Sequence, residues 1–577
     1  MHLGSYRARS RCRSDGDSRS RRDRKSLKGG LSLKNHFNRA SSSTLEKMRR
    51  PWLLWYANQA FAWLERLARH KTAMCLLVMS TTMGIRIALL PWLPIPQPYV
   101  ADEFSYLLGA ETFTSGRLTN PTHPMWMHFE TFHQLMRPTY MSMYPPGQML
   151  FLALGQALLG HPWFGVWISF GLFGACLCWM LQNWVPPVYA VLGTAITLAN
   201  ISILGYWMNS YWGGAVAASA GCLLLGTLPR LAQRVSSKDV VLAAIGIVLL
   251  ANTRPYEGMV MSAAAGVALL FLRWRQKRSL LELLSRRCVI PLLLVLAAGA
   301  VLDGYYNYRV TGNALQMPYS VYFREYRSAP VWIMLPESKP PVYRHSVLAN
   351  SWQWELEHFR KIRSSPSLLL DETLTSFRFY YWELLLLPIA LGILLSGSYR
   401  MWAAAGICFF VWGGVLIESN HFPHYIAGGA GLFPLLAMYG FRWLRVIGRK
   451  RGPVLVLALA TVLVMQGVVR RGDEHRHPWE TRPTNFMSPR MIAAREATNQ
   501  GGRHLILVRH SADYMDKSDE CVYNSANIDA SDIVWAHDMG DAKNRELLDY
   551  YRGSRKVWLY QPDSDARTLV RYELTSQ

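Results

Sequence analysis

Long apolar runs alternate with short polar connections over most of the chain. A helix needs about 20 apolar residues to cross roughly 30 Å of hydrocarbon, and about eleven runs approach that length. The pattern therefore predicts a mainly α-helical, polytopic transmembrane bundle. We expect spans near residues 74–94, 163–181, 188–208, 215–231, 239–253, 257–272, 288–310, 383–398, 401–418, 426–444 and 453–470.

The pattern changes after the last run. HLILV (504–508), DIVWA (532–536) and KVWLY (556–560) are short apolar segments of the kind that form buried strands. AKNRELLDYY (542–551) has the spacing of a helix. Residues 471–577 are therefore expected to form a small α/β domain outside the membrane.

The N-terminus differs from both parts. Residues 1–50 hold 15 Lys and Arg against 4 Asp and Glu, with few apolar residues. This composition predicts a disordered basic tail. Residues 51–72 place Trp, Phe and Leu at helical spacing, which is typical of a helix lying at the membrane interface.

Basic residues indicate the orientation. The tail and the connections 230–238, 273–287 and 442–451 are all basic, and alternation of the spans puts them on one side. Basic loops mark the cytoplasmic face. We therefore expect a multi-pass protein of the inner or plasma membrane, with a cytoplasmic N-terminus. A transmembrane domain over 73–470 would have outer loops 95–162 and 311–382, followed by an extracytoplasmic C-terminal domain.

Composition supports this interpretation. Apolar residues make up 51% of the chain and charged residues 17%, against roughly 25% charged in soluble proteins. The formal charge of +24 is attributed to basic loops that mark the cytoplasmic side and contact anionic lipid headgroups, rather than to nucleic-acid binding. The eight cysteines show neither a disulfide framework nor a zinc spacing. Arg509-His510-Ser511 resembles the strand end of histidine phosphatases, but Gly is missing after the His and the remaining domain is too short.

The first candidate catalytic residues along the chain are the adjacent Asp102 and Glu103, just beyond the first span. Acidic residues also start helices, so a purely structural role is the alternative. Further polar motifs follow in the same outer segment. They are Thr122-His123-Pro124, Arg137-Pro138-Thr139-Tyr140 and Tyr144-Pro145-Pro146-Gly147-Gln148, the last opening an interfacial helix over 148–159.

These motifs resemble the C-type membrane glycosyltransferase superfamily. The closest branch is that of the protein O-mannosyltransferases and the lipid A aminoarabinose transferase. An acidic pair after the first span and a Pro-Pro loop before an interfacial helix carry the resemblance, which covers roughly residues 74–440. It implies a multi-spanning fold and transfer from a polyprenyl-phosphate sugar. It also implies that Asp102 is the catalytic base and that Glu103 orients it or helps to bind a cation.

The leaving phosphate needs cationic and hydrogen-bonding partners. The sequence offers several residues at outer turns that could bind this phosphate. Arg254 is one of them, and the alternative for Arg254 is a purely structural pair with Glu257. Relatives often carry Lys or His where this chain has Tyr144. The substrate-binding candidates are Arg137, Tyr144, Arg254, Glu257, His421, His424 and Tyr425.

The motifs predict neither a cofactor nor a metal-binding residue, and they leave open whether the protein uses a divalent cation. The segment Asn209-Ser210-Tyr211-Trp212-Gly213-Gly214 lacks the acidic residue that helps some relatives to hold a metal. Its Tyr and Trp are interpreted as membrane-interface anchors, with sugar stacking as the alternative.

The resulting hypothesis is an inverting glycosyltransferase acting on the outer face. It would move a sugar from a polyprenyl-phosphate donor to a lipid, glycan or protein acceptor. The alternatives are a transporter or flippase of lipid-linked sugars and an inactive relative that only binds them. Acidic residues lie mainly in outer loops rather than in spans, with Asp303 as the main exception. The sugar, the acceptor and the oligomeric state do not follow from the sequence.

Overall fold

The computed structural model describes residues 52, 54–201, 203–380, 383–470, 487–514, 520–564 and 567–573. The chain forms two compact units, Met1–Gln59 and Ala60–Gln577. The expected basic tail lies outside the described residues. Residues 54–68 are helical, in agreement with the helix expected there; its place at the membrane interface stays a prediction.

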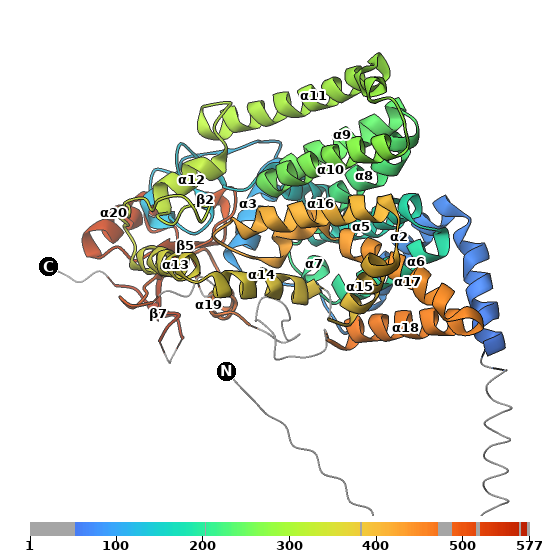
Figure 1. The fold of residues 1–577 in the computed structure, drawn as a ribbon. Coiled ribbons are helices and arrows are strands. Elements are labelled where there is room, and N and C mark those ends of the chain that lie inside the picture. Colours follow the sequence, from blue (N-terminus) through green and yellow to red (C-terminus); the bar gives the residue numbers. More distant parts are fainter. Residues whose placement is uncertain are drawn as a thin grey trace, which may run out of the picture. The chain divides into compact units, whose positions relative to one another are not determined.

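Helices dominate the second unit (Figure 1), so the predicted fold class, mainly α with a small C-terminal sheet, is confirmed. Every predicted span overlaps a helix in the described residues. These helices are α2 (Lys71–Ala88), α5 (Trp163–Trp184), α6 (Pro187–Ile201), α8 (Ala215–Gln233), α9 (Ser237–Ala251), α10 (Pro255–Arg275), α11 (Arg286–Thr311), α15 (Leu386–Leu395), α16 (Tyr399–Leu416), α17 (Leu432–Ile447) and α18 (Gly452–Arg470).

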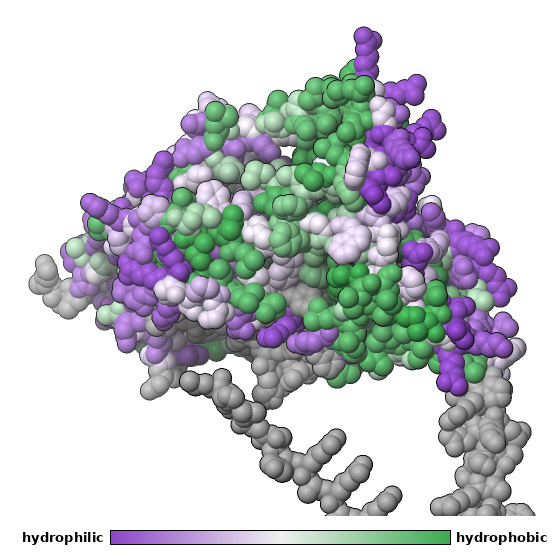
Figure 2. Space-filling model, in the orientation of Figure 1, coloured by the Kyte–Doolittle hydropathy of each residue, from purple (hydrophilic) through white to green (hydrophobic). Residues whose placement is uncertain are grey.

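Six helices of the described residues are long and apolar enough to cross a membrane: α5, α8, α10, α11, α16 and the helical run 449–469. Their outer surfaces are apolar. On α11, Leu294 is 65% exposed and Val301 is 70% exposed. Figure 2 shows hydrophobic residues gathered over α11 and over the region of α15, α17 and α18. Such surface is costly in water but suits lipid, so the chain is an integral membrane protein.

Several helix boundaries differ from the expectation. Helix α2 ends at Ala88 rather than near residue 94. Pro91 and Pro94 follow, and proline cannot continue a helix. The buried guanidinium of Arg86 donates to the carbonyls of Leu93 (2.8 Å) and Pro94 (3.2 Å) and fixes this turn. The span expected over 188–208 also divides, into α6 and the short α7 (Tyr206–Asn209).

The outer segments contain their own structure. The first holds α3 (Ala101–Thr114), a three-stranded sheet and α4 (Pro146–Leu159), and the second holds α12 (Pro318–Tyr326), α13 (Ser346–Ser364) and α14 (Pro366–Tyr380). On α4, Leu150, Leu154 and Leu158 are 54%, 43% and 65% exposed at a spacing of four residues. One face of α4 is therefore apolar and unpartnered, as expected of an interfacial helix. The sheet consists of β1 (Asn120–Pro121), β3 (Thr139–Ser142) and β2 (Gln134–Leu135), in that order.

The C-terminal region forms the expected α/β domain. Its sheet has the order β5-β4-β6-β7, and β4 (His504–Val508) pairs in parallel with β5 (Ile533–His537) and β6 (Lys556–Tyr560). Leu505 and Leu507 of β4 join a core with α20 (Asp541–Tyr551), whereas Ile506 and Val508 join a core with α19 (Pro489–Asn499). Alternate residues of a strand face opposite sides, so each face of the sheet has one helix. Helix α19 and the short antiparallel strand β7 (Val570–Arg571) were not predicted.

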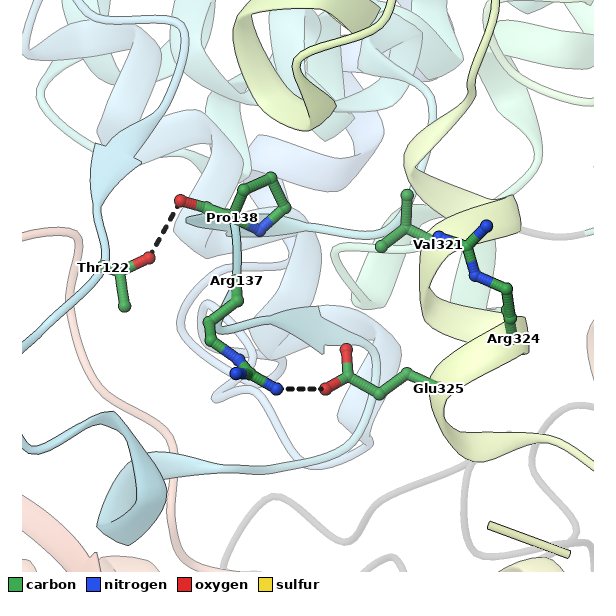
Figure 3. Close-up of a pocket in the computed structure, with 6 residues that line it drawn as sticks. All are labelled: Thr122, Arg137, Pro138, Val321, Arg324 and Glu325. Atoms are coloured by element: carbon green, nitrogen blue, oxygen red, sulfur yellow. Dashed lines mark hydrogen bonds and ion pairs between the residues drawn. The ribbon is translucent and has the colours of Figure 1, made fainter.

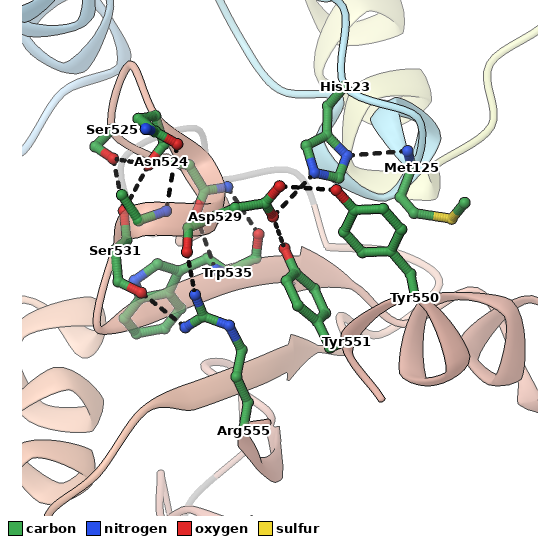
Figure 4. A network of polar contacts seen from close by, with 12 residues as sticks. His123, Met125, Asn524, Ser525, Asp529, Ser531, Trp535, Tyr550, Tyr551 and Arg555 are labelled. Carbon is green, nitrogen blue, oxygen red and sulfur yellow. Dashed lines mark hydrogen bonds and ion pairs between the residues drawn. The ribbon is translucent and has the colours of Figure 1, made fainter. Parts of the chain in front are cut away.

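This domain packs against the first outer segment. Asp529 accepts hydrogen bonds from Tyr550 (2.7 Å) and Tyr551 (2.9 Å), and lies 3.1 Å from Nε2 of His123. Figure 4 shows these three side chains converging on the Asp529 carboxylate. His123 comes from the Thr122-His123-Pro124 motif, so that motif forms part of an interface between the domain and the outer loop.

Candidate active site

Asp102 and Glu103 occupy the first turn of α3. Val100 precedes the helix in an extended conformation, and acidic residues in a first turn interact favourably with the helix dipole. The two side chains then diverge in environment. The side chain of Asp102 is 23% exposed, whereas Glu103 is fully buried.

The Asp102 carboxylate belongs to a chain of three polar side chains. The Tyr144 hydroxyl donates to Oδ1 of Asp102, and Nδ1 of His133 lies 3.1 Å from the Tyr144 oxygen. Since the single hydroxyl proton is directed to Asp102, His133 acts as the donor to Tyr144. Within the described part of the chain, Oδ2 of Asp102 has only a 3.6 Å contact with Nδ1 of His133. One carboxylate oxygen is therefore oriented while the other can still accept a proton.

The sequence interpretation did not include His133. Its φ of 60° lies in the left-handed region, which non-glycine residues seldom adopt and which recurs at functional sites. The backbone amide of His133 donates to the Tyr322 hydroxyl of α12 at 2.8 Å and holds this conformation. No motif around His133 signalled this, because the partner residue comes from the distant second outer segment.

Aromatic rings enclose the hydroxyl of Tyr144. Its ring stacks on Tyr106 at 4.5 Å and meets Tyr319 edge-on at 5.3 Å. Burial, followed by the negative charge of Asp102, raises the pKa of Tyr144 well above its ordinary value. Tyr144 therefore remains protonated and acts as a donor to Asp102. The structure places Tyr144 beside the proposed base.

Glu103 has a different environment. Its Oε2 accepts the amides of Tyr99 (2.8 Å) and Val100 (3.1 Å), and its Oε1 accepts the amide of Tyr211 (3.1 Å). The first two contacts cap α3, and the third ties the helix to the segment 209–214. Both oxygens therefore hold backbone, which favours a positioning role over a direct role in proton transfer.

The interpretation of Tyr211 and Trp212 as interface anchors was wrong. Their side chains are only 2% and 6% exposed and lie within the protein core. The Tyr211 hydroxyl donates to the Pro96 carbonyl at 2.8 Å, and the amide of Gln148 donates to the Tyr211 carbonyl at 3.0 Å. The segment contacts Glu103 and Gln148 inside the protein instead of facing lipid.

The Pro-Pro loop and the Arg254 turn are in direct contact. The Gly147 amide donates to the Asn252 carbonyl at 2.8 Å. A Cβ at position 147 would lie 2.5 Å from that oxygen and 2.6 Å from Cγ2 of Thr253, so only glycine fits this approach. The turn is also tied to α11, since Asn252 donates to Asp303 at 3.2 Å. Asp303 therefore has a structural partner.

Arg254 stands immediately before α10, one turn before Glu257, and its side chain makes no capping hydrogen bond. Among the described residues, no ion pair within 4.0 Å joins Arg254 to a carboxylate. The guanidinium lies 4.9 Å from the centre of the Tyr425 ring. Arg254, Glu257 and Tyr425 line one small cavity. The positive charge of Arg254 also opposes the rise in the pKa of Tyr106 that burial causes, so Arg254 is within electrostatic reach of the Asp102 site.

His424 adjoins this group but is packed among aromatic rings. It is 3% exposed, and its ring lies 4.6 Å from Trp212 and 5.1 Å from Tyr425. His421 points elsewhere, because its Nδ1 lies 3.5 Å from Glu372 of α14. The two histidines of the outer turn therefore do not form a pair.

Arg137 is separate from the Asp102 group. Its guanidinium lies 3.5 Å from Glu325 and 4.2 Å from the centre of the Trp126 ring. Figure 3 shows it directed towards Glu325 of α12. A pocket of about 570 Å³ lies here, lined by Thr122, Arg137, Pro138, Val321, Arg324 and Glu325.

Among the described residues, His510, Glu520 and His537 of the C-terminal domain lie close enough together to share a metal ion. Asp102 is not among them. His510 was considered in the sequence only as part of a phosphatase-like segment.

Neither a family model nor a curated protein matches the chain. Among solved structures, ArnT from Cupriavidus metallidurans bound to undecaprenyl phosphate is similar at 12% identity. The match covers 86% of this chain and 96% of the ArnT chain, with a TM-score of 0.45. The Archaeoglobus fulgidus oligosaccharyltransferase, in a complex with Zn and sulfate, is similar at 10% identity. It covers 84% of this chain and 68% of that chain, with a TM-score of 0.41.

Proposed function

We propose that the chain is an inverting glycosyltransferase of the membrane's outer face. It moves a sugar from a polyprenyl-phosphate donor to an acceptor hydroxyl. The observation that carries the proposal is the Asp102 carboxylate, which Tyr144 orients and which retains an oxygen for a proton. The outer-face assignment rests on the basic connections, which alternation of the spans places on one side.

In this reaction the acceptor oxygen attacks the anomeric carbon as the bond from that carbon to the phosphate oxygen breaks. The phosphate leaves with the electron pair, and Asp102 takes the acceptor's proton. A carboxylate suffices because the hydroxyl becomes acidic only as the glycosidic bond forms. Inversion needs one base on the face opposite the leaving group. Oδ2 of Asp102, on a side chain that is 23% exposed, fits that role.

Arg254 is proposed to bind the donor phosphate. Its guanidinium is not paired with a described carboxylate within 4.0 Å, and Arg254 stands immediately before α10, where the helix dipole adds positive potential. A guanidinium can form two parallel hydrogen bonds with a phosphate. Its turn contacts Gly147, two residues beyond the start of the Pro-Pro pair. Phosphate at Arg254 would therefore lie near the start of α4.

The exposed leucine face of α4 offers a path for the donor's lipid. Leu150, Leu154 and Leu158 form one apolar stripe that begins near the Gly147–Asn252 contact. A polyprenyl chain lying on this stripe would stay in the bilayer while its phosphate reached Arg254. The proposed donor thus matches both an apolar surface and a cation at its end.

The test uses a strain that lacks the gene, in which an unused donor accumulates. Its lipid extract is incubated with purified protein in nanodiscs, and release of polyprenyl phosphate is followed by liquid chromatography and mass spectrometry. Asp102→Asn should reduce turnover by about a hundredfold or more, at the low end of acid–base contributions, while donor binding persists. Tyr144→Phe should reduce it less, because one orienting hydrogen bond is lost.

Asp371→Asn is the matched control, since the Asp371 side chain is 67% exposed on α14. It should turn over as the wild type does. Near-normal turnover of Asp102→Asn would remove the base assignment. An unaltered donor that is merely trapped on the inner leaflet of the deletion strain would instead support a flippase.

A further inference from the structure

Three metal-ligating side chains meet at one edge of the C-terminal sheet. His537 ends β5, His510 follows β4, and Glu520 lies in the connection between these strands. The parallel register pairs Val508 with His537, which brings both strand ends together. The candidate ligand atoms all lie within 4.8 Å of one another. The carboxyl ends of parallel strands are a common place for ligand sites.

This group is buried, yet several of its polar atoms lack hydrogen bonds. The side chains of His510 and Glu520 are 3% and 0% exposed. Both ring nitrogens of His510 and Oε2 of Glu520 have no hydrogen-bond partner among the described residues. The nearest approach is 3.3 Å, between His510 Nε2 and Glu520 Oε2. Buried polar atoms are normally satisfied, so these three atoms need a partner.

His537 is prepared as a ligand by its own hydrogen bond. Its Nε2 lies 2.8 Å from the carbonyl of Glu130. A carbonyl can only accept, so Nε2 carries the proton and Nδ1 keeps its lone pair. Metal-bound histidines usually donate their other ring N–H to such an oxygen.

The group combines two imidazoles with one carboxylate. This set suits a borderline divalent ion such as Zn²⁺, which binds nitrogen and oxygen in tetrahedral geometry.

We propose that His510, Glu520 and His537 bind one Zn²⁺ ion, with water as the fourth ligand. The ion joins the ends of β4 and β5 to the segment that begins at Glu520. That segment continues to Tyr523, whose ring stacks on Phe104 of α3 at 4.1 Å. The metal thereby holds the C-terminal domain against the helix that carries Asp102. This inference is independent of the proposed transferase activity.

The test measures metal in the full-length protein, purified with a tag that lacks histidine. Inductively coupled plasma mass spectrometry should find about one Zn²⁺ per chain. After removal by a chelator, ZnSO₄ alone should rebind in a calorimetric titration. His510→Ala, Glu520→Gln and His537→Ala should each weaken binding at least tenfold. His161→Ala, a histidine on the α4–α5 connection, is the control and should bind as the wild type does.

Two further measurements keep the proposal decisive if a variant fails to fold. Co²⁺ added to the stripped wild type should give the visible absorption bands of a tetrahedral site. Zn²⁺ should raise the apparent melting temperature of the stripped wild type, whereas Mg²⁺ should not. A wild type that neither retains nor rebinds Zn²⁺ would show that His510 and Glu520 form only a buried ion pair. Unchanged Zn²⁺ affinity in His510→Ala would also overturn the site.

Discussion

Replacing Glu103 with Gln separates the two adjacent acidic residues by their physical roles. Glu103 is buried and accepts three backbone amides, two on Oε2 and one on Oε1. Gln offers one carbonyl oxygen and one NH₂ group. In either orientation of the Gln side chain, its NH₂ group faces at least one backbone N–H. The hydrogen bonds that the replaced oxygen accepted are then lost.

The magnitude follows from those contacts. A hydrogen bond to a charged group contributes about 1.5–3 kcal/mol, and a neutral one about 0.5–1.5 kcal/mol. Glu103→Gln loses one charge-assisted bond and weakens the others, so we expect a loss of about 3 kcal/mol. At roughly 2 °C per kcal/mol for larger domains, the apparent melting temperature falls by about 6 °C. Turnover per folded molecule should fall less than tenfold, because Asp102 and Tyr144 remain in place.

The assay pairs thermal unfolding in detergent with turnover per folded molecule. Glu111→Gln is the matched control on the same helix. Its Oε2 accepts only the Ala526 amide at 3.0 Å in the described structure, and Gln can accept that bond as well. Asp102→Asn should show the opposite signature, with normal melting and little turnover. If Glu103→Gln melted as the wild type and lost turnover a hundredfold, Glu103 would take part in the chemistry and the positioning role would be wrong.

Three further predictions follow from the same structure. Arg254→Ala should weaken donor binding at least tenfold, and Arg254→Lys should restore part of it without the two-pronged contact; unchanged donor affinity in a less stable protein would make Arg254 structural. In a cysteine-free background, an impermeant thiol reagent should label Arg545→Cys in intact cells but not Arg278→Cys, and the reverse result would invert the topology. Burial would raise the pKa of Asp529, but hydrogen bonds from Tyr550, Tyr551 and His123 hold that pKa below its ordinary value. Its contribution is present above pH about 4 and lost as pH falls further, so Asp529→Asn should flatten the acid limb of a melting-temperature profile.

The sequence predicted the helices well, because the length and polarity of each run depend on local composition. The strands 504–508 and 556–560 were also placed correctly. Helix ends were less accurate where a side chain decides them. Arg86, for example, binds carbonyls beyond the end of α2. Tyr211 and Trp212 were misassigned because aromatic residues look alike in sequence whether they face lipid or a protein core.

The site was predicted only where short sequence motifs mark its residues. Asp102 and Tyr144 were identified from short motifs, and the structure brings them into contact. His133 was missed, since its orientation depends on Tyr322 from another outer segment. The cluster around His537 was missed for a similar reason. Its spacing fits no metal motif, and only the register of β4 and β5 brings the three side chains together.

The contacts of α3 suggest what the C-terminal domain contributes. Tyr523 stacks on Phe104 of α3, and the Ala526 amide donates to Glu111 of the same helix. These contacts hold one side of α3, while Glu103 holds its first turn. On β3, which contacts α3, the Tyr140 hydroxyl donates to the Asn524 carbonyl at 2.9 Å. A base must keep its orientation within a few tenths of an ångström to remain in line with a reacting hydroxyl. We therefore propose that the domain positions the helix of Asp102, in addition to any contact with the acceptor. Its attachment to the site would then be needed even for an acceptor that never touches the domain.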